Sequence, residues 1–383
     1  MSESTPPLID RAATILRPPQ SVVMNTPRSV DLSLTGKCNL RCKTCFYADE
    51  MQSLRDMSTE RWLVLMDELG TLGVMHANLS GGEPLARRDF PTILARLVAN
   101  RLRFSMNSNG ILFDAESARL LADTHRCDTV QVSMDGSCPE IHNLIRGPGA
   151  FEGAMRGIHH LLGAGLKISV RVTINRINVH DLPALFHLLF EEMGFSQVST
   201  NEVFARGAGR CYVDELELNA EERVVARHHC LDAAARYPSL GAMAGPLVEA
   251  RQLADIRAAM AGRSDWQRNG GGYLSACGSV FNKLAILHNG AVVPCTQLPH
   301  LVLGYVGQEP LGTLWRQAEA LRYLRERRHI PLERLEGCRG CRYQCFCTGG
   351  CPAMAYAATG ELTAVDPRGC YQRLLAEEVA DVV

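Results

Sequence analysis

Short β-rich runs alternate with amphipathic stretches of ten to sixteen residues between positions 29 and 204. Strands that alternate with helices in this way predict parallel βαβ units. The helical stretches have the apolar spacing of one buried helix face, near 58–72, 87–100, 114–124, 149–164 and 180–193. The expected strands are Ser29–Thr35, His76–Ser80, Arg103–Asn107, Thr129–Met134, Ile168–Ile174 and Gln197–Val203.

Six parallel strands fit either an open doubly wound sheet or a partial (β/α) barrel, and both place their chemistry at the carboxyl ends of the strands. Residues 1–28 are rich in Pro and Ser and are expected to form an arm. Residues 205–276 are rich in Ala and Arg, mostly helical by periodicity, and are expected to bridge two domains. The second domain, 277–383, is expected to contain a hairpin over Ala285–Pro294 that turns at Asn289-Gly290.

Composition narrows the functional class. The chain has 383 residues, of which 46% are hydrophobic and 21% charged, as in an ordinary globular protein. Its 40 basic and 41 acidic residues nearly cancel, so nucleic acid is not an expected partner. No apolar run reaches the roughly 18 residues of a membrane span, and the N-terminus does not resemble a signal peptide. We therefore expect a cytoplasmic protein without a membrane partner.

Cysteine is the exception, with fifteen residues. An odd count fits poorly with a closed disulfide framework, and clustered cysteines in a reducing compartment more often bind metal. Cys38, Cys42 and Cys45 have the spacing C-x3-C-x2-C directly after the first expected strand. Three thiolates hold one face of an iron–sulfur cluster and leave one iron open to an exchangeable ligand. The alternatives are a zinc site completed elsewhere in the chain or a loop of reduced cysteines.

This array, with three later motifs in register, resembles the radical S-adenosylmethionine (radical SAM) enzymes. Gly81-Gly82-Glu83-Pro84 is similar to the GGE(P) motif that binds the amino group of SAM in that family. Asn107 and Asn109 lie in a segment similar to the family's asparagine–glycine segment, Asn107-Ser108-Asn109-Gly110. Ser133-Met134-Asp135-Gly136, followed by His142 and Arg146, resembles the region that touches the ribose and carboxylate of SAM. Each motif alone also fits a turn or a helix cap.

One position departs from the family pattern. Members usually carry an aromatic residue immediately before the third cysteine, whereas this chain has Thr44 there and Phe46 and Tyr47 after Cys45. Because backbone groups make much of the adenine contact in the family, SAM binding is expected to survive. The detail of the adenine pocket is left open.

Seven further cysteines follow a second spacing: Cys277-x12-Gly290-x4-Cys295, then Cys338-x2-Cys341-x5-Cys347-x3-Cys351, then Cys370. This spacing resembles that of the SPASM domain at all seven cysteines. In that family the domain holds two auxiliary 4Fe–4S clusters. The resemblance implies one cluster on Cys338, Cys341, Cys347 and Cys370, and another on Cys277, Cys295 and Cys351. The second set has three ligands, because the position that supplies a fourth in some relatives is Lys283; either Cys345 completes it or the site is open. A pair of zinc ribbons is the alternative, although zinc would not explain the first array.

The remaining cysteines, Cys127, Cys138, Cys211 and Cys230, fit no spacing and are expected to be small buried apolar residues. Taken together, the resemblance implies an α/β fold: a partial (β/α)6 TIM barrel over 29–204, the bridge, and a small α+β SPASM domain that ends in a C-terminal helix.

The implied activity is reductive cleavage of SAM to a 5′-deoxyadenosyl radical, which abstracts a substrate hydrogen and leads to oxidation. The implied cofactors are SAM and three 4Fe–4S clusters. The expected substrate is a peptide or protein that receives a crosslink or a dehydrogenation, as in ribosomal peptide maturation. Alternatives are a small molecule such as a tetrapyrrole, cofactor or sugar, a sulfatase, or a non-catalytic iron–sulfur redox role. The implied partners are a flavodoxin- or ferredoxin-type electron donor and a separate leader-recognition protein.

Overall fold

The computed structural model describes residues 22–377 except 54, 204, 239–240, 243–244, 265–270 and 276. Most of the expected N-terminal arm therefore lies outside the described residues. The chain divides into two compact units. The barrel unit comprises Asn25–Ala250 and Lys283–Arg316, and the cysteine-rich unit comprises Met1–Met24, Arg251–Asn282 and Gln317–Val383.

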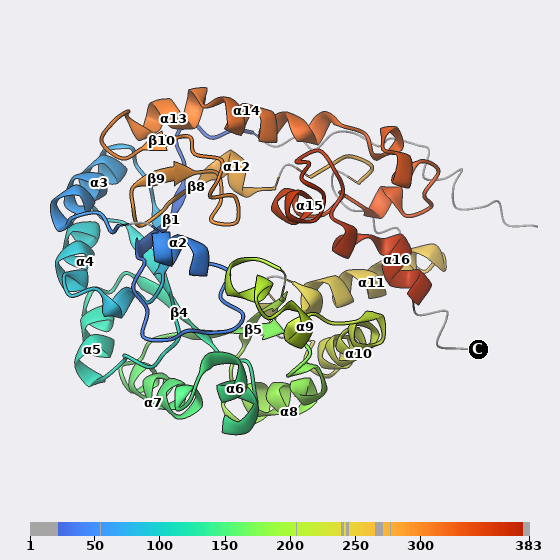
Figure 1. Cartoon of the computed structure of the whole chain (residues 1–383), viewed down its shortest axis with the longest axis horizontal. Helices are drawn as coiled ribbons and strands as arrows, with labels where there is room; N and C mark the ends of the chain where they lie inside the picture. The colour runs from blue at the N-terminus through green and yellow to red at the C-terminus, as the bar shows by residue number, and fades with distance from the viewer. Residues whose placement is uncertain are drawn as a thin grey trace, which may run out of the picture. The chain divides into compact units, whose positions relative to one another are not determined.

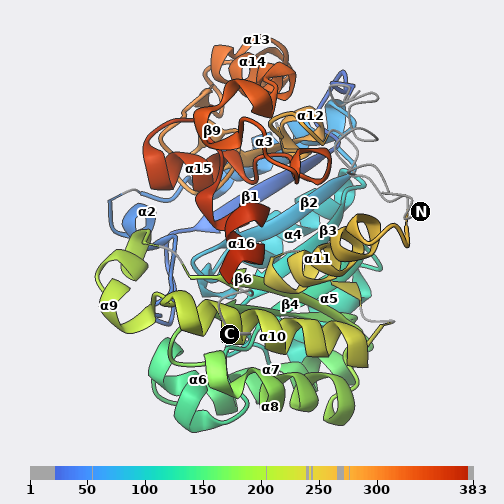
Figure 2. The same cartoon turned by 90° about the vertical axis from the view of Figure 1, so that its right-hand side faces the viewer.

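Six parallel strands form the centre of the barrel unit, each within two residues of the expected bounds at either end. Neighbouring strands are consecutive in sequence and are joined by helices, which is the βαβ topology that the sequence predicted. Figure 2 shows strands of this sheet side by side. The strands are β1 (Ser29–Thr35), β2 (His76–Gly81), β3 (Arg103–Ser108), β4 (Cys127–Ser133), β5 (Ile168–Ile174) and β6 (Gln197–Glu202).

Helices cover the outside of this sheet and follow one another around it (Figure 1). Their starts are set by local polar caps: the Ser58 hydroxyl accepts the Arg61 N–H at α3, and Asp114 and Ser117 form a capping box at α5. Two helices, α2 and α6, were not expected from periodicity. The helices are α2 (Ala48–Ser53), α3 (Thr59–Thr71), α4 (Phe90–Ala99), α5 (Ala115–Asp123), α6 (Pro139–Arg146), α7 (Ala150–Gly163) and α8 (Leu182–His187).

The two faces of the barrel strands differ in chemistry. Apolar residues such as Leu32, Leu79, Phe104 and Val172 are fully or almost fully buried, as expected beneath the helices. Residues at the alternate positions point to the opposite, inner face. They are polar and many are partly accessible: Asn78, Ser80, Ser105, Asn107, Ser133, Arg171, Thr173 and Asn201. The barrel interior is therefore a polar lumen with accessible wall residues.

Within the described part of the chain, the sheet extends beyond the six expected strands to ten, in the order β10-β9-β8-β1-β2-β3-β4-β5-β6-β7. The expected hairpin is present as β8 (Lys283–Ile286) and β9 (Ala291–Val293), and its turn uses Gly290 at φ +90°. β8 pairs in parallel with β1. This pairing places the hairpin, with the short β10 (Gly304–Tyr305) and α13 (Leu311–Gln317), in the barrel sheet or beside it, although the sequence grouped them with the second domain.

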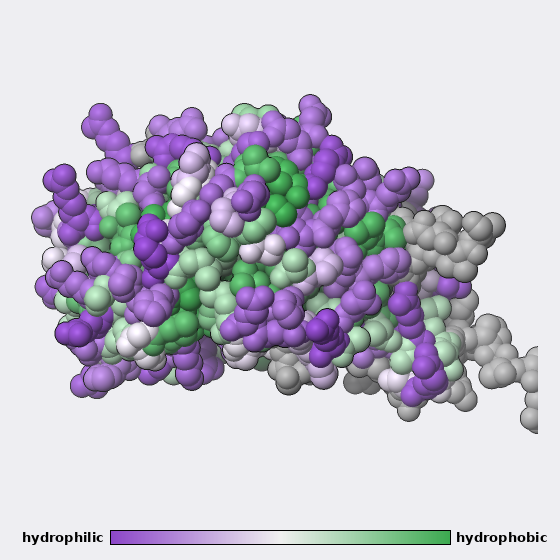
Figure 3. Space-filling model, turned by 90° about the horizontal axis from the view of Figure 1, so that it is seen from below, coloured by the Kyte–Doolittle hydropathy of each residue, from purple (hydrophilic) through white to green (hydrophobic). Residues whose placement is uncertain are grey.

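The expected bridge contains α9 (Val213–Leu216), α10 (Ala220–Arg236), the two-residue β7 (Gly241–Ala242) and α11 (Pro246–Met260). The cysteine-rich unit adds α12 (Ser279–Asn282), α14 (Glu319–Glu326), α15 (Pro352–Thr359) and α16 (Tyr371–Glu377). Among the described residues, no helix is both long and apolar enough to cross a membrane. The face shown in Figure 3 is mainly hydrophilic, with smaller apolar areas between the polar side chains.

Candidate functional site

The first cysteine array lies in the loop that follows β1, at the carboxyl edge of the sheet. The Cys45 N–H donates to the Cys42 carbonyl at 3.2 Å, and the Lys43 N–H donates to the Ile145 carbonyl at the end of α6. Cys42 Sγ is 4.0 Å from an Arg146 Nη atom, and Cys38 Sγ is 3.9 Å from the Asn109 Nδ2 atom. The structure thus brings the three cysteines to Asn109 and Arg146, two residues that sequence motifs had assigned to SAM.

The donor set of this loop fits an iron–sulfur cluster. None of the fifteen cysteines forms a disulfide. Burial raises the pKa of Cys38 and Cys45, and raises that of Cys42 to about 11, so the thiols need a positive partner to ionise at neutral pH. Among the described residues, no three His, Cys, Asp or Glu side chains are close enough to share a single metal ion. Three thiol donors in one loop fit an iron–sulfur cluster, in which each thiolate would ligate its own iron.

The end of β2 approaches the cysteine loop so closely that only glycine fits. A Cβ atom on Gly82 would lie 2.2 Å from the Lys37 carbonyl oxygen, and one on Gly81, at φ +123°, would lie 2.5 Å from the Thr35 carbonyl oxygen. The Glu83 N–H donates to the Lys37 carbonyl at 2.8 Å. Pro84 then starts a short 3-10 helix. The glycine pair therefore locks the β2 loop against the cysteine loop.

Glu83 is fully buried, and its carboxylate contacts the next strand. Its oxygens accept hydrogen bonds from the Ser108 hydroxyl at 2.9 and 3.0 Å and from the Asn109 N–H at 2.9 Å. Burial raises the pKa of Glu83 to about 7. The sequence assigned Glu83 to the SAM ammonium, whereas in the structure this carboxylate braces the segment that carries Asn109. The Asn109 amide in turn donates to Asn39 Oδ1 at 2.8 Å.

Asp135, at the end of β4, is the centre of a second buried network. Its carboxylate accepts Arg146 Nε at 2.7 Å and the Thr173 N–H at 2.7 Å. Its own N–H donates to His142 Nδ1 at 3.1 Å, so this nitrogen is deprotonated, and burial lowers the pKa of His142 to about 3. The ion pair between Asp135 and Arg146 therefore holds the Arg146 guanidinium beside Cys42 in one orientation. Of the other motif residues, Ser133 and Asn107 lie on the accessible inner face.

A third set of contacts was not found from the sequence, because no spacing marks it. Arg206, in the loop after β6, donates to Glu50 Oε1 at 3.0 Å and to Gln297 Oε1 at 3.1 Å. The Gln297 N–H is 3.4 Å from Cys295 Sγ. The same loop meets the cluster loop directly, since the Ala208 N–H donates to the Cys45 carbonyl at 2.9 Å. Within the barrel unit, this chain of polar contacts joins the first array to Cys295.

The cysteine-rich unit contains six of the seven other array cysteines. Cys338, Cys341, Cys347 and Cys370 form one group, because within it the charge of neighbouring cysteines adds to burial in raising the pKa of Cys338, Cys341 and Cys347. These four cysteines are the ones that the resemblance predicts as ligands of one auxiliary cluster, and that ligand set stays a prediction.

Cys351 and Cys277 form a separate pair, since the charge of Cys277 helps to raise the pKa of Cys351, although burial contributes most. Asp366 lies at this pair, where Oδ2 accepts the Cys351 N–H at 3.4 Å. The buried Arg327 guanidinium holds the surrounding backbone by donating to the carbonyls of Ser275, Leu362 and Ala364.

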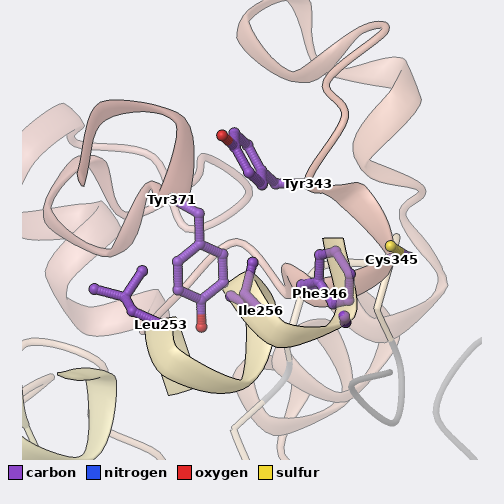
Figure 4. Packing of buried hydrophobic residues seen from close by; sticks show 7 residues of the cluster. Leu253, Ile256, Tyr343, Cys345, Phe346 and Tyr371 are labelled. Carbon is purple, nitrogen blue, oxygen red and sulfur yellow. The ribbon is translucent and has the colours of Figure 1, made fainter. Parts of the chain in front are cut away.

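Cys345 belongs to the apolar core of this unit. It is 8% exposed and clusters with Leu253, Ile256 and Phe346, with Tyr343 and Tyr371 nearby (Figure 4). Burial contributes most to the raised pKa of Cys345, and the charge of Cys341, a member of the four-cysteine group, raises it further. These surroundings favour a packing role for Cys345 over completion of the set that contains Cys277 and Cys351.

Replacing Cys345 by serine should therefore leave the iron content unchanged. It should lower the free energy of unfolding by about 1–3 kcal/mol, because a hydroxyl replaces a thiol in an apolar cluster. Iron analysis after anaerobic reconstitution and denaturant unfolding measure the two effects. Cys341→Ser is the matched control and should lose about four irons. If Cys345→Ser instead loses about four irons together with its turnover, Cys345 is a cluster ligand.

The cysteines outside the arrays do not behave as one class. Cys230 on α10 is fully buried, as expected. Cys211 is exposed, and Cys127 and Cys138 are partly exposed. The expectation of burial was therefore wrong for three of the four, because loop and strand-end positions leave side chains accessible whatever their polarity.

Two family profiles match the chain. Residues 32–189 match the Radical SAM superfamily, and residues 277–342 match SPASM, an iron–sulfur cluster-binding domain. The chain is 30% identical over 365 residues to Fe-coproporphyrin III synthase of Methanosarcina barkeri, covering 91% of this chain and 88% of that protein. It is 29% identical to AdoMet-dependent heme synthase of Nitratidesulfovibrio vulgaris, covering 91% and 93%. It is 27% identical to PqqA peptide cyclase of Granulibacter bethesdensis, covering 89% and 86%.

Solved structures share the fold. The enzyme anSMEcpe with bound AdoMet superposes with a TM-score of 0.67 at 17% identity, covering 93% of this chain and 98% of that chain. Streptococcus suis SuiB bound to the precursor peptide SuiA superposes with a TM-score of 0.66 at 14% identity, covering 91% and 77%. The similarity to these two solved structures extends over 91% and 93% of this chain.

Proposed function

The chain belongs to the radical SAM superfamily, and from this premise we propose that it is a SPASM-type enzyme that oxidatively modifies a peptide or protein. Its radical SAM domain binds a 4Fe–4S cluster and SAM, and its SPASM domain binds auxiliary iron–sulfur clusters. When bound, these groups supply a 5′-deoxyadenosyl radical that abstracts hydrogen from an unactivated carbon. The observation that carries the reaction class is the three-cysteine loop braced by Gly82, Asn109 and Arg146.

The protein's own residues would act by orientation. Cys38, Cys42 and Cys45 would hold the SAM-binding cluster, and Asp135 would keep the Arg146 guanidinium beside it. Gly81 and Gly82 would let backbone approach the methionine end of SAM. Ser133 and Asn107 face the lumen, where polar wall residues would hold the reactants together and limit solvent access.

The same assignment gives the remaining array cysteines an auxiliary role. Cys338, Cys341, Cys347 and Cys370 would hold one cluster, and Cys277, Cys295 and Cys351 the other. Clusters held by these cysteines would supply a one-electron acceptor for the substrate radical that remains after hydrogen abstraction. The first electron would come from a flavodoxin- or ferredoxin-type donor, and a peptide substrate would be presented by a separate leader-recognition protein.

The peptide assignment is supported by relatives whose names describe peptide maturation, among them the PqqA peptide cyclase and the mycofactocin maturase MftC of Mycolicibacterium smegmatis, each 27% identical. A tetrapyrrole is the second candidate. It is supported by the Fe-coproporphyrin III synthase and heme synthase relatives, whose identities of 30% and 29% are slightly higher.

Parallel assays separate the two candidates. The anaerobically reconstituted enzyme is incubated with SAM and a reductant, together with either the short peptides encoded beside its gene or iron coproporphyrin III. We expect 5′-deoxyadenosine to form in step with a peptide product that has lost hydrogen atoms, detected by mass spectrometry. A substrate-dependent mass change of the porphyrin, with unchanged peptides, would establish the tetrapyrrole assignment instead. SAM cleavage with neither change would contradict both.

A further inference from the structure

Among the residues that the structure describes, Arg171 is a cation on the inner face of the barrel whose environment the proposed chemistry does not explain. Arg171 is in the middle of β5, in register with Ser133 on β4 and Ser199 on β6. Its side chain therefore lies on the inner face, beside a residue of the Ser133–Gly136 motif, and it is partly accessible. A guanidinium at this position is within the space where SAM and substrate must meet.

The partners of Arg171 are neutral amides. Its Nε donates to Gln131 Oε1 at 2.7 Å. One Nη atom lies 2.6 Å from the Asn201 amide oxygen, when that amide is oriented with its oxygen toward the guanidinium. Burial lowers the pKa of Arg171, although its side chain stays cationic at neutral pH. Both amides thus orient the guanidinium without neutralising it.

The carboxylates near Arg171 form ion pairs with other cations. Asp135 accepts Arg146 at 2.7 Å, and Asp31 accepts the Lys283 ammonium at 3.1 Å. Among the described residues, no carboxylate forms an ion pair with Arg171. Burial lowers the pKa of Arg171 even though the charges of Asp135 and Asp31 oppose this shift, so these two carboxylates offset only part of the desolvation cost. A ligand anion that pairs directly with Arg171 can offset more of it, and a guanidinium matches a carboxylate with two parallel hydrogen bonds.

We propose that Arg171 is a substrate-binding residue that receives a carboxylate of the substrate within the lumen. SAM also carries a carboxylate, but the cation beside the cluster loop is Arg146, 4.0 Å from Cys42 Sγ, whereas Arg171 is on β5 and contacts β4 and β6. The substrate class is therefore one with a carboxylate close to the reacting carbon. Acidic or C-terminal residues of a peptide and the side-chain acids of a tetrapyrrole both belong to it.

This inference rests on the proposed function for the nature of the reaction, so its test uses neither candidate substrate. The probe is propionate, with propionamide as its neutral counterpart, added to the cluster-loaded enzyme at equal ionic strength. Thermal unfolding is measured for the wild type and for Arg171→Gln and Arg171→Lys. Arg103→Gln is the matched control, because Arg103 already pairs with Asp128.

We expect propionate, but not propionamide, to raise the unfolding midpoint of the wild type and of Arg103→Gln. The rise should be absent in Arg171→Gln and partly restored in Arg171→Lys, which keeps the charge but loses the two-pronged geometry. If Arg171 only braces the strands, Arg171→Gln will unfold earlier in every buffer and propionate will shift both proteins equally. That result would overturn the proposal.

The affinity for SAM shows whether Arg171 receives a carboxylate of the substrate or the carboxylate of SAM. Arg171→Gln should bind SAM within about threefold of the wild type by anaerobic equilibrium dialysis. A fall of about tenfold or more in SAM affinity would assign the site to SAM and contradict the proposal. The propionate and SAM measurements can be interpreted even if the peptide and porphyrin assays both fail. The proposed function and the carboxylate-binding role of Arg171 can therefore be contradicted independently of each other.

Discussion

Replacing Cys38, Cys42 and Cys45 together by alanine is expected to abolish SAM cleavage and to lower the iron content from about twelve to about eight per chain. The three thiols are the donors of the β1 loop, and the residues around them are an amide, a guanidinium and a thioether, which do not replace thiolates as iron ligands. Iron analysis and 5′-deoxyadenosine formation after anaerobic reconstitution measure the two effects.

The matched control removes three cysteines outside the arrays, Cys127, Cys138 and Cys211, none of which is fully buried. This variant should keep about twelve irons and its SAM cleavage. Zinc in place of iron after strictly anaerobic preparation would contradict the iron–sulfur assignment, as would SAM cleavage that survives in the first triple variant.

Replacing Glu83 by alanine is expected to weaken SAM binding by about a hundredfold while leaving the iron content unchanged. The carboxylate is fully buried and accepts the Ser108 hydroxyl and the Asn109 N–H, so its removal leaves both donors buried without an acceptor. The segment that holds Asn109 against Asn39 and Cys38 would then relax. Equilibrium dialysis and iron analysis measure the result.

Glu83→Gln distinguishes bracing from a direct charge interaction. Glutamine retains an oxygen for the Asn109 N–H, so a bracing role predicts a loss of no more than about tenfold. Equal losses in the glutamine and alanine variants would show that the charge itself acts on the SAM ammonium. Glu116→Ala, on the exposed side of α5, is the control and should bind SAM as the wild type does.

The pH dependence of stability gives an independent measurement. Burial raises the pKa of Glu83 from 4.5 to about 7, so the folded chain binds this proton more tightly than the unfolded chain. Stability then decreases as the pH rises, and it levels off above the folded pKa. Between about pH 6 and pH 8, the wild type should lose on the order of 1 kcal/mol relative to Glu83→Gln, measured by denaturant unfolding. A constant difference across this range would contradict the burial assigned to Glu83.

Much of the fold was determined by local sequence. β1 and β5 have the bounds expected from their residues, and the other barrel strands differ by one or two residues at their ends. Alternation of strand and helix is a local pattern, so it specified the parallel barrel strands before any contact was known. The spacing of the first cysteines and the Gly81–Gly82 pair likewise identified the cofactor loop, because metal ligation and close backbone approach both require particular residues at short spacing.

The tertiary structure decided which side chains pair across the barrel. The sequence motifs predicted a role in SAM binding for Glu83 and Arg146, and the structure shows the residues that position their side chains: Ser108, Asn109 and Asp135. It also brings β8 to β1, where Lys283 meets Asp31 from 252 positions away.

Arg171 and Arg206 lie in no recognisable motif, and their partners come from other strands or loops. Such contacts depend on strand curvature, register and the packing of distant segments, which residue spacing does not encode. The sequence by itself therefore determined the cofactor chemistry, through its resemblance to the radical SAM family, while only the tertiary structure decided which polar residues surround the cysteine loop and which amides orient Arg171.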